Sequence, residues 1–423
     1  MYITFNKLFY SSSLLIFSLL LFSTPEEVSA VPAFARQTNM VCSSCHFQHF
    51  PALNSFGRSF RASGYTMTGG QGMIESDNTS LPVMLNASII AKLRYNKSNG
   101  NTNIGTDHGE IQWPDEAALL IGGKLAKNVG FLMELGLGDV ASETEGQTTT
   151  ANSFLSTKLH FEVADFDGTK ISVIPFSTDG LGVAYGFELL NTGAQRSQRP
   201  IEERKGFSAA QALGLGSGEA TGIALVASRH DFFVNYTPWV PGWGGTHTTV
   251  KPSGLAHYFR AAYMPAIGNW DTGAGIQLWS GAANVSDDVG GETEIETDGW
   301  VIDAQAQGSV AHMPLGLYAS YGQCKGSDNH FSSNCSNSNK ADSYAFLGQL
   351  GILSKVDIYA AYRTLDDGAV VNSRFNSFTL GGNYMYSQNI RFESYVVKES
   401  GSGVDARTSE QDSKFLLQLF VGF

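Results

Sequence analysis

The chain has 423 residues, of which 16% are charged and 42% are hydrophobic, and its formal net charge is −12. This acidic charge opposes nucleic-acid binding, and the sequence contains no phosphate-binding loop or nucleophilic triad. After residue 30 no run of 18 apolar residues occurs, so the sequence predicts no transmembrane helix.

The first thirty residues predict an export signal. Lys7 gives a short positive region, residues 14–22 are almost wholly apolar, and small residues stand at 28–30, where signal peptidase would cleave. The apolar stretch is short for a bilayer span, so a retained transmembrane anchor is the weaker alternative. We therefore expect residues 1–30 to be a signal peptide and the rest of the chain to lie outside the cytoplasm.

Cys42 and Cys45 are followed directly by His46 in the sequence C-S-S-C-H. Two thiols at this spacing can each bond a haem vinyl group, and the adjacent His then serves as an axial ligand of the iron. A structural disulfide, a redox dithiol and half of a zinc site are the alternatives. No second C-x-x-C would complete a zinc site, and no βαβ pattern surrounds the motif. The sequence therefore predicts one covalent haem c with His46 as its proximal ligand.

Met67 is the sequence's candidate for the sixth haem ligand, because it can fold back over the distal face. No sixth protein ligand, or another residue, is the alternative. Arg36 and Arg58, together with Arg61, could neutralise the haem propionates, although arginines that face solvent or a barrel lumen are an equal alternative.

The motif belongs to a short N-terminal domain, which we expect to span residues 31–75. A segment of this size rarely folds alone, although a haem would supply apolar surface for its aromatic residues to cover. Residues 76–82 are rich in Ser, Asn and Pro and predict a linker. We therefore expect the haem domain to need the following region, residues 83–423, as a partner.

Apolar and polar residues alternate along several segments of that region. Every odd position of 83–95 is apolar, and the same period of two recurs in 155–163, 300–307 and 415–423. Such alternation over about ten residues is typical of a transmembrane β-barrel, although a soluble β-sandwich also alternates.

The connections distinguish the two folds, because long polar loops and tight turns follow each other in turn along the chain. They join sixteen strands if residues 169–188 form one irregular strand, and the terminal Phe423 also suits an outer-membrane barrel. We thus predict an all-β fold, an antiparallel outer-membrane β-barrel of about 16 strands with the haem domain in its lumen and both termini on the periplasmic side. The long loops are expected near 97–113, 140–152, 190–218, 241–254, 281–297, 323–341, 365–374 and 399–412.

Cys324 and Cys335 are the remaining cysteines and lie in a polar stretch. A disulfide between them could contribute about 3 kcal/mol and is allowed in an oxidising compartment, and two free thiols are the alternative.

One predicted outside loop carries a dense acidic run. Its carboxylates could attract a divalent cation such as Fe(II), although a solvated loop, or one bridged to lipopolysaccharide by ordinary divalent ions, is the alternative. The acidic residues are Asp287, Asp288, Glu292, Glu294, Glu296 and Asp298.

About thirty-five residues resemble the fused monohaem cytochrome–porins of iron-oxidising bacteria. The resemblance rests on Phe34–Thr38, on Cys42–Gln48, and on Phe50–Arg58 with Gly64–Thr66. Asn39 stands where the family pattern suggests Gly, but no haem bond depends on it. The resemblance implies an Fe(II) oxidase whose haem takes electrons from extracellular Fe(II) and passes them to a periplasmic carrier such as a soluble cytochrome c.

Two other functions would use the same parts. An outward conduit would reduce extracellular acceptors, with its direction set by the haem potential and its partners. A porin or solute channel would carry the haem segment as a plug, and it would conduct ions in planar bilayers whereas a plugged oxidase would conduct almost none.

Overall fold

The structure is a computed structural model of the chain. It describes residues 32–77, 79–100, 107–137, 154–202, 207–242, 253–286, 292–407 and 412–423. The chain divides into two units, Met1–Ala30 and Val31–Phe423, and the architecture below is that of the second unit. The expected signal peptide, residues 1–30, lies outside the described residues.

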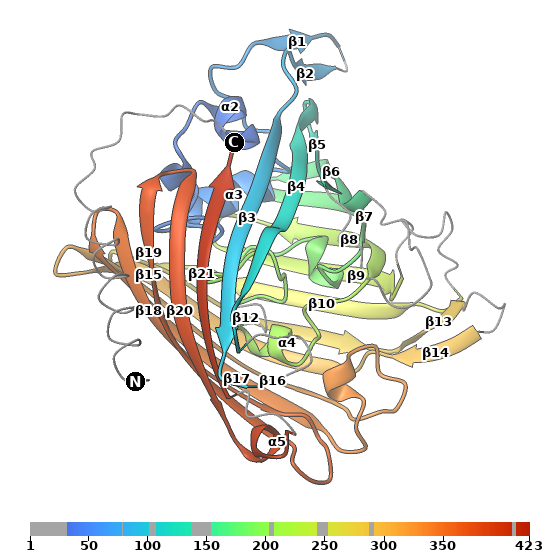
Figure 1. The fold of residues 1–423 in the computed structure, drawn as a ribbon. Helices are drawn as coiled ribbons and strands as arrows, with labels where there is room; N and C mark the ends of the chain where they lie inside the picture. Colours follow the sequence, from blue (N-terminus) through green and yellow to red (C-terminus); the bar gives the residue numbers. More distant parts are fainter. Residues whose placement is uncertain are drawn as a thin grey trace. The chain divides into compact units, whose positions relative to one another are not determined.

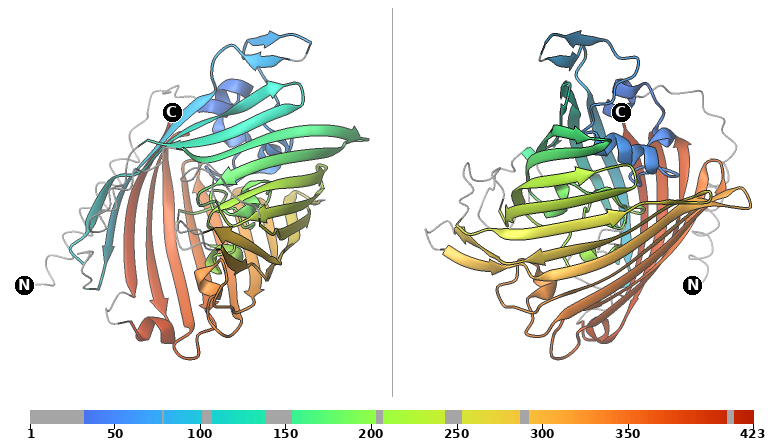
Figure 2. Two further views of the ribbon diagram at one scale, coloured as in Figure 1. Left: turned by 90° about the vertical axis from the view of Figure 1, so that its right-hand side faces the viewer. Right: turned by 180° about the vertical axis from the view of Figure 1, so that it is seen from behind.

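Within the described part of the second unit, sixteen antiparallel strands form a closed β-barrel, as Figures 1 and 2 show. The strands are β3 (Ala87–Ser98), β4 (Glu110–Ala126), β5 (Val129–Gly136), β6 (Phe154–Phe166), β7 (Thr169–Thr178), β8 (Ala220–Ser228), β9 (Phe232–Val240), β10 (Ala256–Tyr263) continued by β11 (Ala266–Ile267), β12 (Trp270–Ser280), β15 (Gly299–Val310), β16 (Met313–Cys324), β17 (Ala341–Leu353), β18 (Val356–Asp366), β19 (Arg374–Ser387), β20 (Ile390–Ser400) and β21 (Ser413–Gly422). β21 pairs with β3, which closes the barrel.

Two hairpins and several short helices complete the described elements. The hairpins are β1 (Met73–Glu75) with β2 (Ser80–Pro82), and β13 (Ala282–Ser286) with β14 (Glu292–Glu296). The helices are α2 (Ala33–Thr38), η1 (Cys42–Ser44), α3 (Ser55–Ala62), η2 (Val183–Tyr185), α4 (Ala209–Ala212), η3 (Ser333–Cys335) and α5 (Ser402–Asp405). None of the helices in the described ranges is both long and apolar enough to cross a membrane.

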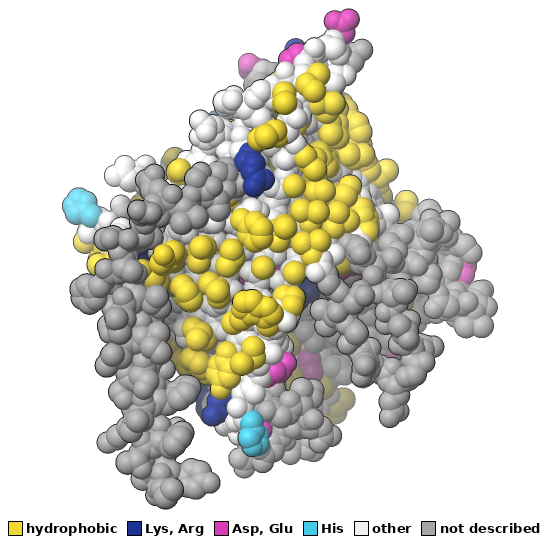
Figure 3. Space-filling view, turned by 45° about the horizontal axis from the view of Figure 1, so that its top comes forward, with side chains coloured by type: hydrophobic (Ala, Val, Ile, Leu, Met, Phe, Trp, Pro, Cys, Tyr) yellow, Lys and Arg dark blue, Asp and Glu magenta, His cyan; other side chains and the backbone are white. Residues whose placement is uncertain are grey.

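The alternation of the sequence places apolar side chains on the outside of the barrel and polar ones inside. On β18, Ile358 and Tyr362 are 45% and 39% exposed, whereas Tyr359 between them is buried. On β3, Lys92 and Arg94 are buried on the inner face. Figure 3 shows apolar side chains gathered over one outer face of the molecule. This inversion of the usual burial pattern follows directly from the period of two in the sequence.

The strand count of sixteen is correct, and short turns alternate with longer connections along the barrel, as the sequence predicts. Asp167 and Gly168, which join β6 to β7, both have positive φ, as do Ala311 and His312 between β15 and β16. Two consecutive residues of this kind form the turns whose twist matches a tight hairpin. All tight turns and the C-terminus lie at one end of the barrel, which we call the turn end, and α5 lies at the opposite, loop end (Figure 1).

The prediction of one irregular strand over 169–188 is wrong, as is that of an outside loop over 190–218. β7 ends at Thr178, and the chain then turns inward as a lumen segment, residues 179–202 and 207–219, before β8. Most of its residues are buried, and Leu189 and Leu213 have no more than 1% of their surface exposed. The segment enters the barrel because it carries enough apolar side chains to form a core there.

This core has two main parts. One gathers Leu213 and Leu215 of the lumen segment against Trp239 and Trp279 of the barrel wall. The other packs Leu189 and Leu190 with Phe233 and neighbouring residues. The lumen of this barrel is therefore filled by its own chain over a large part of its length.

One buried charge network fixes the lumen segment to the wall. Arg260 of β10 lies 2.9 Å from Glu188 of the lumen segment and 2.5 Å from Asp303 of β15, and all three side chains are fully buried. Buried charges require such pairing, because an unpaired one would retain a desolvation penalty of several kcal/mol.

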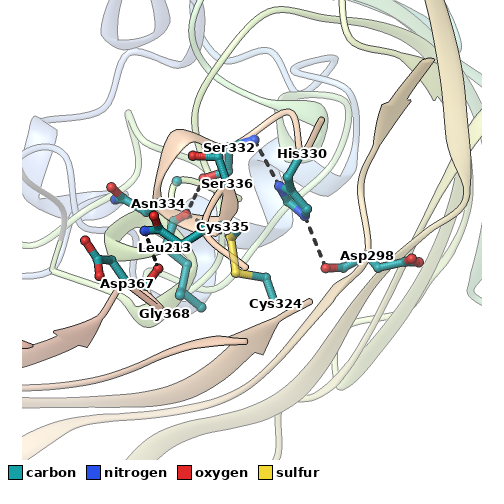
Figure 4. Close-up of a disulfide and its surroundings, with 12 residues drawn as sticks. Leu213, Asp298, Cys324, His330, Ser332, Asn334, Cys335, Ser336, Asp367 and Gly368 are labelled. Carbon is teal, nitrogen blue, oxygen red and sulfur yellow. Dashed lines mark hydrogen bonds between the residues drawn. A yellow bond between two sulfur atoms is a disulfide. The ribbon is translucent and has the colours of Figure 1, made fainter. Parts of the chain in front are cut away.

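A disulfide joins Cys324 at the end of β16 to Cys335 in η3. Its loop lies over the lumen segment, as Figure 4 shows. Asn334 Nδ2 donates a hydrogen bond of 2.7 Å to Ala212 O, and the Ser332 hydroxyl donates one to Leu213 O. The loop thus covers carbonyl groups at the C-terminal end of α4, which the short helix cannot pair internally.

Replacing Cys324 and Cys335 together by Ser is expected to lower the free energy of unfolding by about 3 kcal/mol, because the unfolded chain loses a closed loop. A urea titration in detergent, followed by tryptophan fluorescence, measures the change. Dithiothreitol should destabilise the parent protein by a similar amount and leave the double Ser variant unaffected. Equal unfolding midpoints for the parent and the variant would contradict this expectation.

Candidate functional site

The N-terminal segment, residues 32–70, lies at the turn end of the barrel, where α2 and α3 are found near the C-terminus (Figures 1 and 2). Asn54 begins α3 as its N-cap: its Oδ1 accepts a hydrogen bond of 2.9 Å from Gly57 N. Its Nδ2 donates to Ser44 O at 3.0 Å. One side chain therefore both starts the helix and ties it to the C-S-S-C-H turn.

That turn is the short helix η1. The backbone amides of Cys45 and His46 both donate to Cys42 O, at 3.1 and 3.0 Å. His46 Nδ1 lies 3.2 Å from Ala52 O. This acceptor favours the tautomer that carries its proton on Nδ1, which leaves Nε2 available as a ligand. Enclosure by the protein lowers the pKa of His46 to about 4, so the imidazole is neutral at ordinary pH.

Cys42, Cys45 and His46 line one cavity of about 530 Å³ at the turn end, which we call the turn-end cavity. Both cysteines are free thiols, and burial raises the pKa of Cys45 to about 11. The volume is within the range of small-molecule and cofactor sites. The apolar lining comes from the N-terminal segment, the barrel wall and the lumen segment, and includes Phe34, Phe50, Leu53, Phe60, Tyr65, Ile90, Leu120, Leu132, Leu181, Tyr185 and Phe420.

Aromatic contacts hold this lining in place. Phe50 lies between the His46 ring, at a centroid distance of 5.4 Å, and the Phe420 ring of β21, at 5.3 Å. Phe34 stacks on Tyr65 at 5.0 Å. The barrel wall thus completes the covering that the N-terminal segment is too short to provide alone.

Arg61 and Arg199 are the cationic residues best placed to meet an acidic group in this cavity. Arg61 donates to Gln195 and Gln198 through its terminal nitrogens, but its buried Nε has no partner among the described residues. Arg199 pairs with Glu202 at 2.9 Å, and its buried Nε is also without a partner there. Thiols, a neutral imidazole, an apolar lining and unpaired guanidinium donors together fit a haem.

The structure does not bring the other two predicted propionate contacts to the cavity. Arg36 donates to Ala87 O at the start of β3, and Arg58 pairs with Asp271 of β12 at 2.5 Å. Neither lines the turn-end cavity, because each side chain reaches the barrel wall. Arg61 was named with them from the sequence, whereas Arg199 was not.

Met67, the predicted sixth ligand, does not line the cavity either. It is 36% exposed, and its backbone oxygen accepts a hydrogen bond of 2.8 Å from Gln37 Nε2. Met40 is the methionine among the residues that line the cavity. It lies two residues before Cys42, and the backbone between α2 and η1 turns at Asn39, whose φ is 55°.

Charged side chains from the barrel wall and from the lumen segment also line the cavity. Lys92 Nζ lies 2.7 Å from Glu116 and 2.8 Å from Glu202. Glu134 and Asp179 also line the cavity. Within the described ranges no three His, Cys, Asp or Glu side chains are arranged to hold a metal ion, so these carboxylates form no separate metal centre.

The acidic run predicted to attract Fe(II) lies away from this cavity. Glu292 and Glu294 are exposed on β14, and Glu296 lies 3.3 Å from Lys325. Asp298 follows the hairpin, and its carbonyl oxygen faces His330 at 3.2 Å. The remaining members of the run, Asp287 and Asp288, lie outside the described residues.

Contacts with the wall that no sequence motif indicates hold the N-terminal segment in the barrel mouth. Gln388, in the turn between β19 and β20, accepts a hydrogen bond of 2.8 Å from Cys42 N. His49 is 3% exposed and lies 3.5 Å from Asp357 and 2.7 Å from Gln349. His49 is thus part of the contact between the N-terminal segment and the barrel wall.

Gly57 allows α3 to approach the C-S-S-C-H turn, because a Cβ at this position would overlap Cys45 O. Replacing Gly57 by Ala is expected to cost about 1–3 kcal/mol of local stability and to lower the fraction of chains carrying covalent haem. Haem staining after denaturing electrophoresis measures this fraction. Gly70→Ala is the matched control, since its Cβ would meet no atom closer than 3.6 Å. Equal haem content in both variants would contradict the assigned packing role.

No protein-family model matches the chain, and no curated protein matches it. Among solved structures, a loop-deletion mutant of OmpT, an outer membrane protein of Vibrio cholerae, aligns with a TM-score of 0.47 and 12% identity over 80% of this chain and 99% of that chain. OmpT expressed in the Vibrio cholerae outer membrane aligns with a TM-score of 0.44 and 11% identity over 83% and 100% of the two chains. A mutant of the Rh. blastica porin aligns with a TM-score of 0.47 and 13% identity over 80% and 100%.

Proposed function

We propose that the chain is an outer-membrane electron-transfer protein that oxidises extracellular Fe(II) at a single c-type haem and passes the electron to a periplasmic carrier. The observation that carries the proposal is that Cys42, Cys45 and His46 line one apolar cavity in the mouth of a closed barrel. Fe(II) is named as the substrate because the N-terminal segment resembles the cytochrome–porins of iron-oxidising bacteria.

The outer surface of the barrel supports a place in a membrane. Isolated exposed apolar residues are common on soluble proteins, but an apolar outer face over successive strands is not. Exposed outward residues include Val163, Ile223, Leu225, Ile302, Phe346, Leu380, Val396 and Leu417. An even number of strands with short turns at one end and long loops at the other is the pattern of bacterial outer-membrane barrels, whose short turns face the periplasm.

A haem bound in the turn-end cavity would supply one-electron redox chemistry. The protein's part is to hold and shield it. His46 presents an unprotonated Nε2, because its imidazole is neutral and its Nδ1 is directed at Ala52 O. Phe50 and Phe60 belong to the apolar lining that would shield a haem from water, and Arg61 and Arg199 each offer an unpaired buried Nε donor to acidic groups.

The filled lumen favours the electron-transfer function over the porin alternative. A sixteen-stranded barrel without an insert leaves an aqueous channel, whereas the lumen segment here forms an apolar core inside the barrel. We expect conductance in planar bilayers far below that of an open porin of the same strand number. A conductance equal to that of an open porin would restore the channel alternative.

The deciding experiment is stopped-flow absorbance of the purified ferric protein in detergent after mixing with anaerobic Fe(II). We expect the reduced α-band of the haem to appear rapidly. Appearance with dithionite but not with Fe(II), over a range of pH, would remove the oxidase function and leave the outward conduit. The Cys324→Ser, Cys335→Ser variant serves as a control, because its change lies outside the turn-end cavity.

A further inference from the structure

Tyr65 lies in the wall of the turn-end cavity, and its hydroxyl group has no partner within the chain. The side chain is 4% exposed and lines the cavity, where its ring stacks on Phe34 and lies 5.8 Å from the Phe60 ring, measured between centroids. In the described part of the chain no residue forms a hydrogen bond with the hydroxyl. Buried hydroxyl groups are normally hydrogen-bonded, so this one points to a partner from outside the chain.

The backbone fixes the position of this side chain. Gly64 and Tyr65 have φ values of 67° and 62°, a left-handed conformation that is uncommon for a bulky residue. Tyr65 N donates a hydrogen bond of 3.2 Å to Phe60 O, and Tyr65 O accepts one from Gln37 Nε2. The barrel wall also fits closely, because a Cβ at Gly130 of β5 would overlap Gly64 O. Strained residues of this kind persist where their surroundings hold them, and they cluster at ligand sites.

Two cationic side chains near Tyr65 have no carboxylate partner. Lys158 of β6 is 3% exposed, and its Nζ lies 5.7 Å from the centroid of the Tyr65 ring. It donates a hydrogen bond of 2.9 Å to Tyr185 O but forms no ion pair within the described ranges. Arg61, whose charge acts on both Tyr65 and Lys158, donates to two glutamine side chains of the lumen segment and pairs with no described carboxylate. Buried cations without a counter-charge are costly, so these two favour an anion from outside the chain.

The Tyr65 hydroxyl serves such an anion as a donor. Burial raises the pKa of Tyr65, and the positive charge of Arg61 offsets part of this effect, so the phenol keeps its proton at ordinary pH. A neutral O–H donor beside a guanidinium Nε without a partner suits a carboxylate. Glu134 and Asp179 line the same cavity, but neither accepts a hydrogen bond from Tyr65, Arg61 or Lys158 in the described structure.

We propose that the Tyr65 hydroxyl and Arg61 bind a carboxylate of the haem, one of its propionates, and that Lys158 supplies a balancing charge from behind the Tyr65 and Tyr185 rings. The inference rests on the proposed function, because the haem brings the carboxylate. Tyr65 and Arg61 line the cavity and contact the propionate directly. Lys158 does not line the cavity and acts through its charge alone, as a positioning residue.

Redox titration of the purified haem-bearing protein tests the contact. We expect Tyr65→Phe to keep its covalent haem and to disfavour the ferrous state about tenfold, which lowers the midpoint potential by about 59 mV. The reason is that the propionate loses a donor and keeps more of its negative charge. Lys158→Met should shift the potential in the same direction. Tyr185→Phe is the matched control, because Tyr185 lines the same cavity but its hydroxyl donates to Leu132 O at 3.4 Å.

The stability of the haem-free barrel separates the haem carboxylate from a free anion. In the Cys42→Ser, Cys45→Ser background Lys158 lacks its counter-charge, so Lys158→Met should raise the urea concentration at half-unfolding. In the haem-bearing protein the same change should lower it. Opposite signs in the two backgrounds cannot come from a general packing defect. A decrease in the haem-free barrel would assign the site to a free anion and overturn the haem contact.

The remaining outcomes separate this inference from the proposed function. An unchanged potential in Tyr65→Phe, or an equal shift in Tyr185→Phe, would overturn the propionate contact and leave the oxidase in place. A haem that Fe(II) cannot reduce, in a protein whose potential shifts as expected, would remove the oxidase and support the contact.

Discussion

Replacing Cys42 and Cys45 together by Ser is expected to reduce covalently held haem to background. Two thioether bonds are the attachment that the C-S-S-C-H spacing allows, and Ser cannot form either. Haem staining after denaturing electrophoresis, with the pyridine haemochrome spectrum of the washed protein, measures the attached haem. The parent protein should give one haem per chain.

The matched control for this experiment uses the other two cysteines. Cys324→Ser with Cys335→Ser removes the same number of sulfur atoms from the loop end of the barrel and should leave haem content unchanged. Heat modifiability on gels shows whether each barrel has folded. Covalent haem in the Cys42, Cys45 variant, or none in the parent protein, would contradict the assignment of the motif.

Arg260→Met is expected to lower the free energy of unfolding by about 3–5 kcal/mol, because it leaves two buried carboxylates without a counter-charge. Arg260 is the residue through which Glu188 of the lumen segment and Asp303 of β15 are joined, at 2.9 and 2.5 Å. Urea unfolding in detergent measures the loss. The same variant should also raise conductance in planar bilayers, since the lumen segment loses its charged contact with the wall.

Two further variants define this effect. Arg374→Gln removes an exposed pair with Asp366 and should cost only about 0–1 kcal/mol. Changing Arg260 to Met together with Glu188→Gln and Asp303→Asn should recover part of the stability lost in the single variant, because no buried charge then remains unpaired. A loss in Arg260→Met no larger than that in Arg374→Gln would show that the network does not hold the lumen segment.

The barrel could be predicted because its signal is local. Each strand has a period of two and each tight turn has its own residues, such as Asp167 and Gly168, so that neither depends on distant parts of the chain. The lumen segment could not be identified in this way. Its glycines and polar residues are typical of a loop, and only packing against residues such as Trp239 decides that it folds inward. The sequence signal for inward folding was the apolar run that contains Leu213 and Leu215.

In the candidate site, too, the residues of a local motif could be predicted from the sequence, whereas long-range side-chain contacts could not. Cys42, Cys45 and His46 are assigned by a spacing whose chemistry is local, and the structure places them on one cavity. Contacts made by long side chains are not local. Arg58 and Arg61 stand three residues apart on α3, yet one reaches Asp271 in the wall and the other lines the cavity, which depends on where the helix sits in the barrel.

The pairing of β21 with β3 has a consequence for synthesis and export. The barrel closes only when its last strand is present, and the N-terminal segment makes contacts that span nearly the whole chain: Cys42 N and Gln388 are 346 residues apart. Contacts between residues so far apart in sequence slow folding. The N-terminal segment therefore stays exposed until the strands that contact it have formed. For a haem attached as proposed, this interval is the time when the thiols of Cys42 and Cys45 are fully open to an attachment enzyme, since in the folded chain both are only partly exposed and line the turn-end cavity. Under the proposed function, haem loading would then precede closure of the barrel, because the last strand to be made completes the wall around the N-terminal segment.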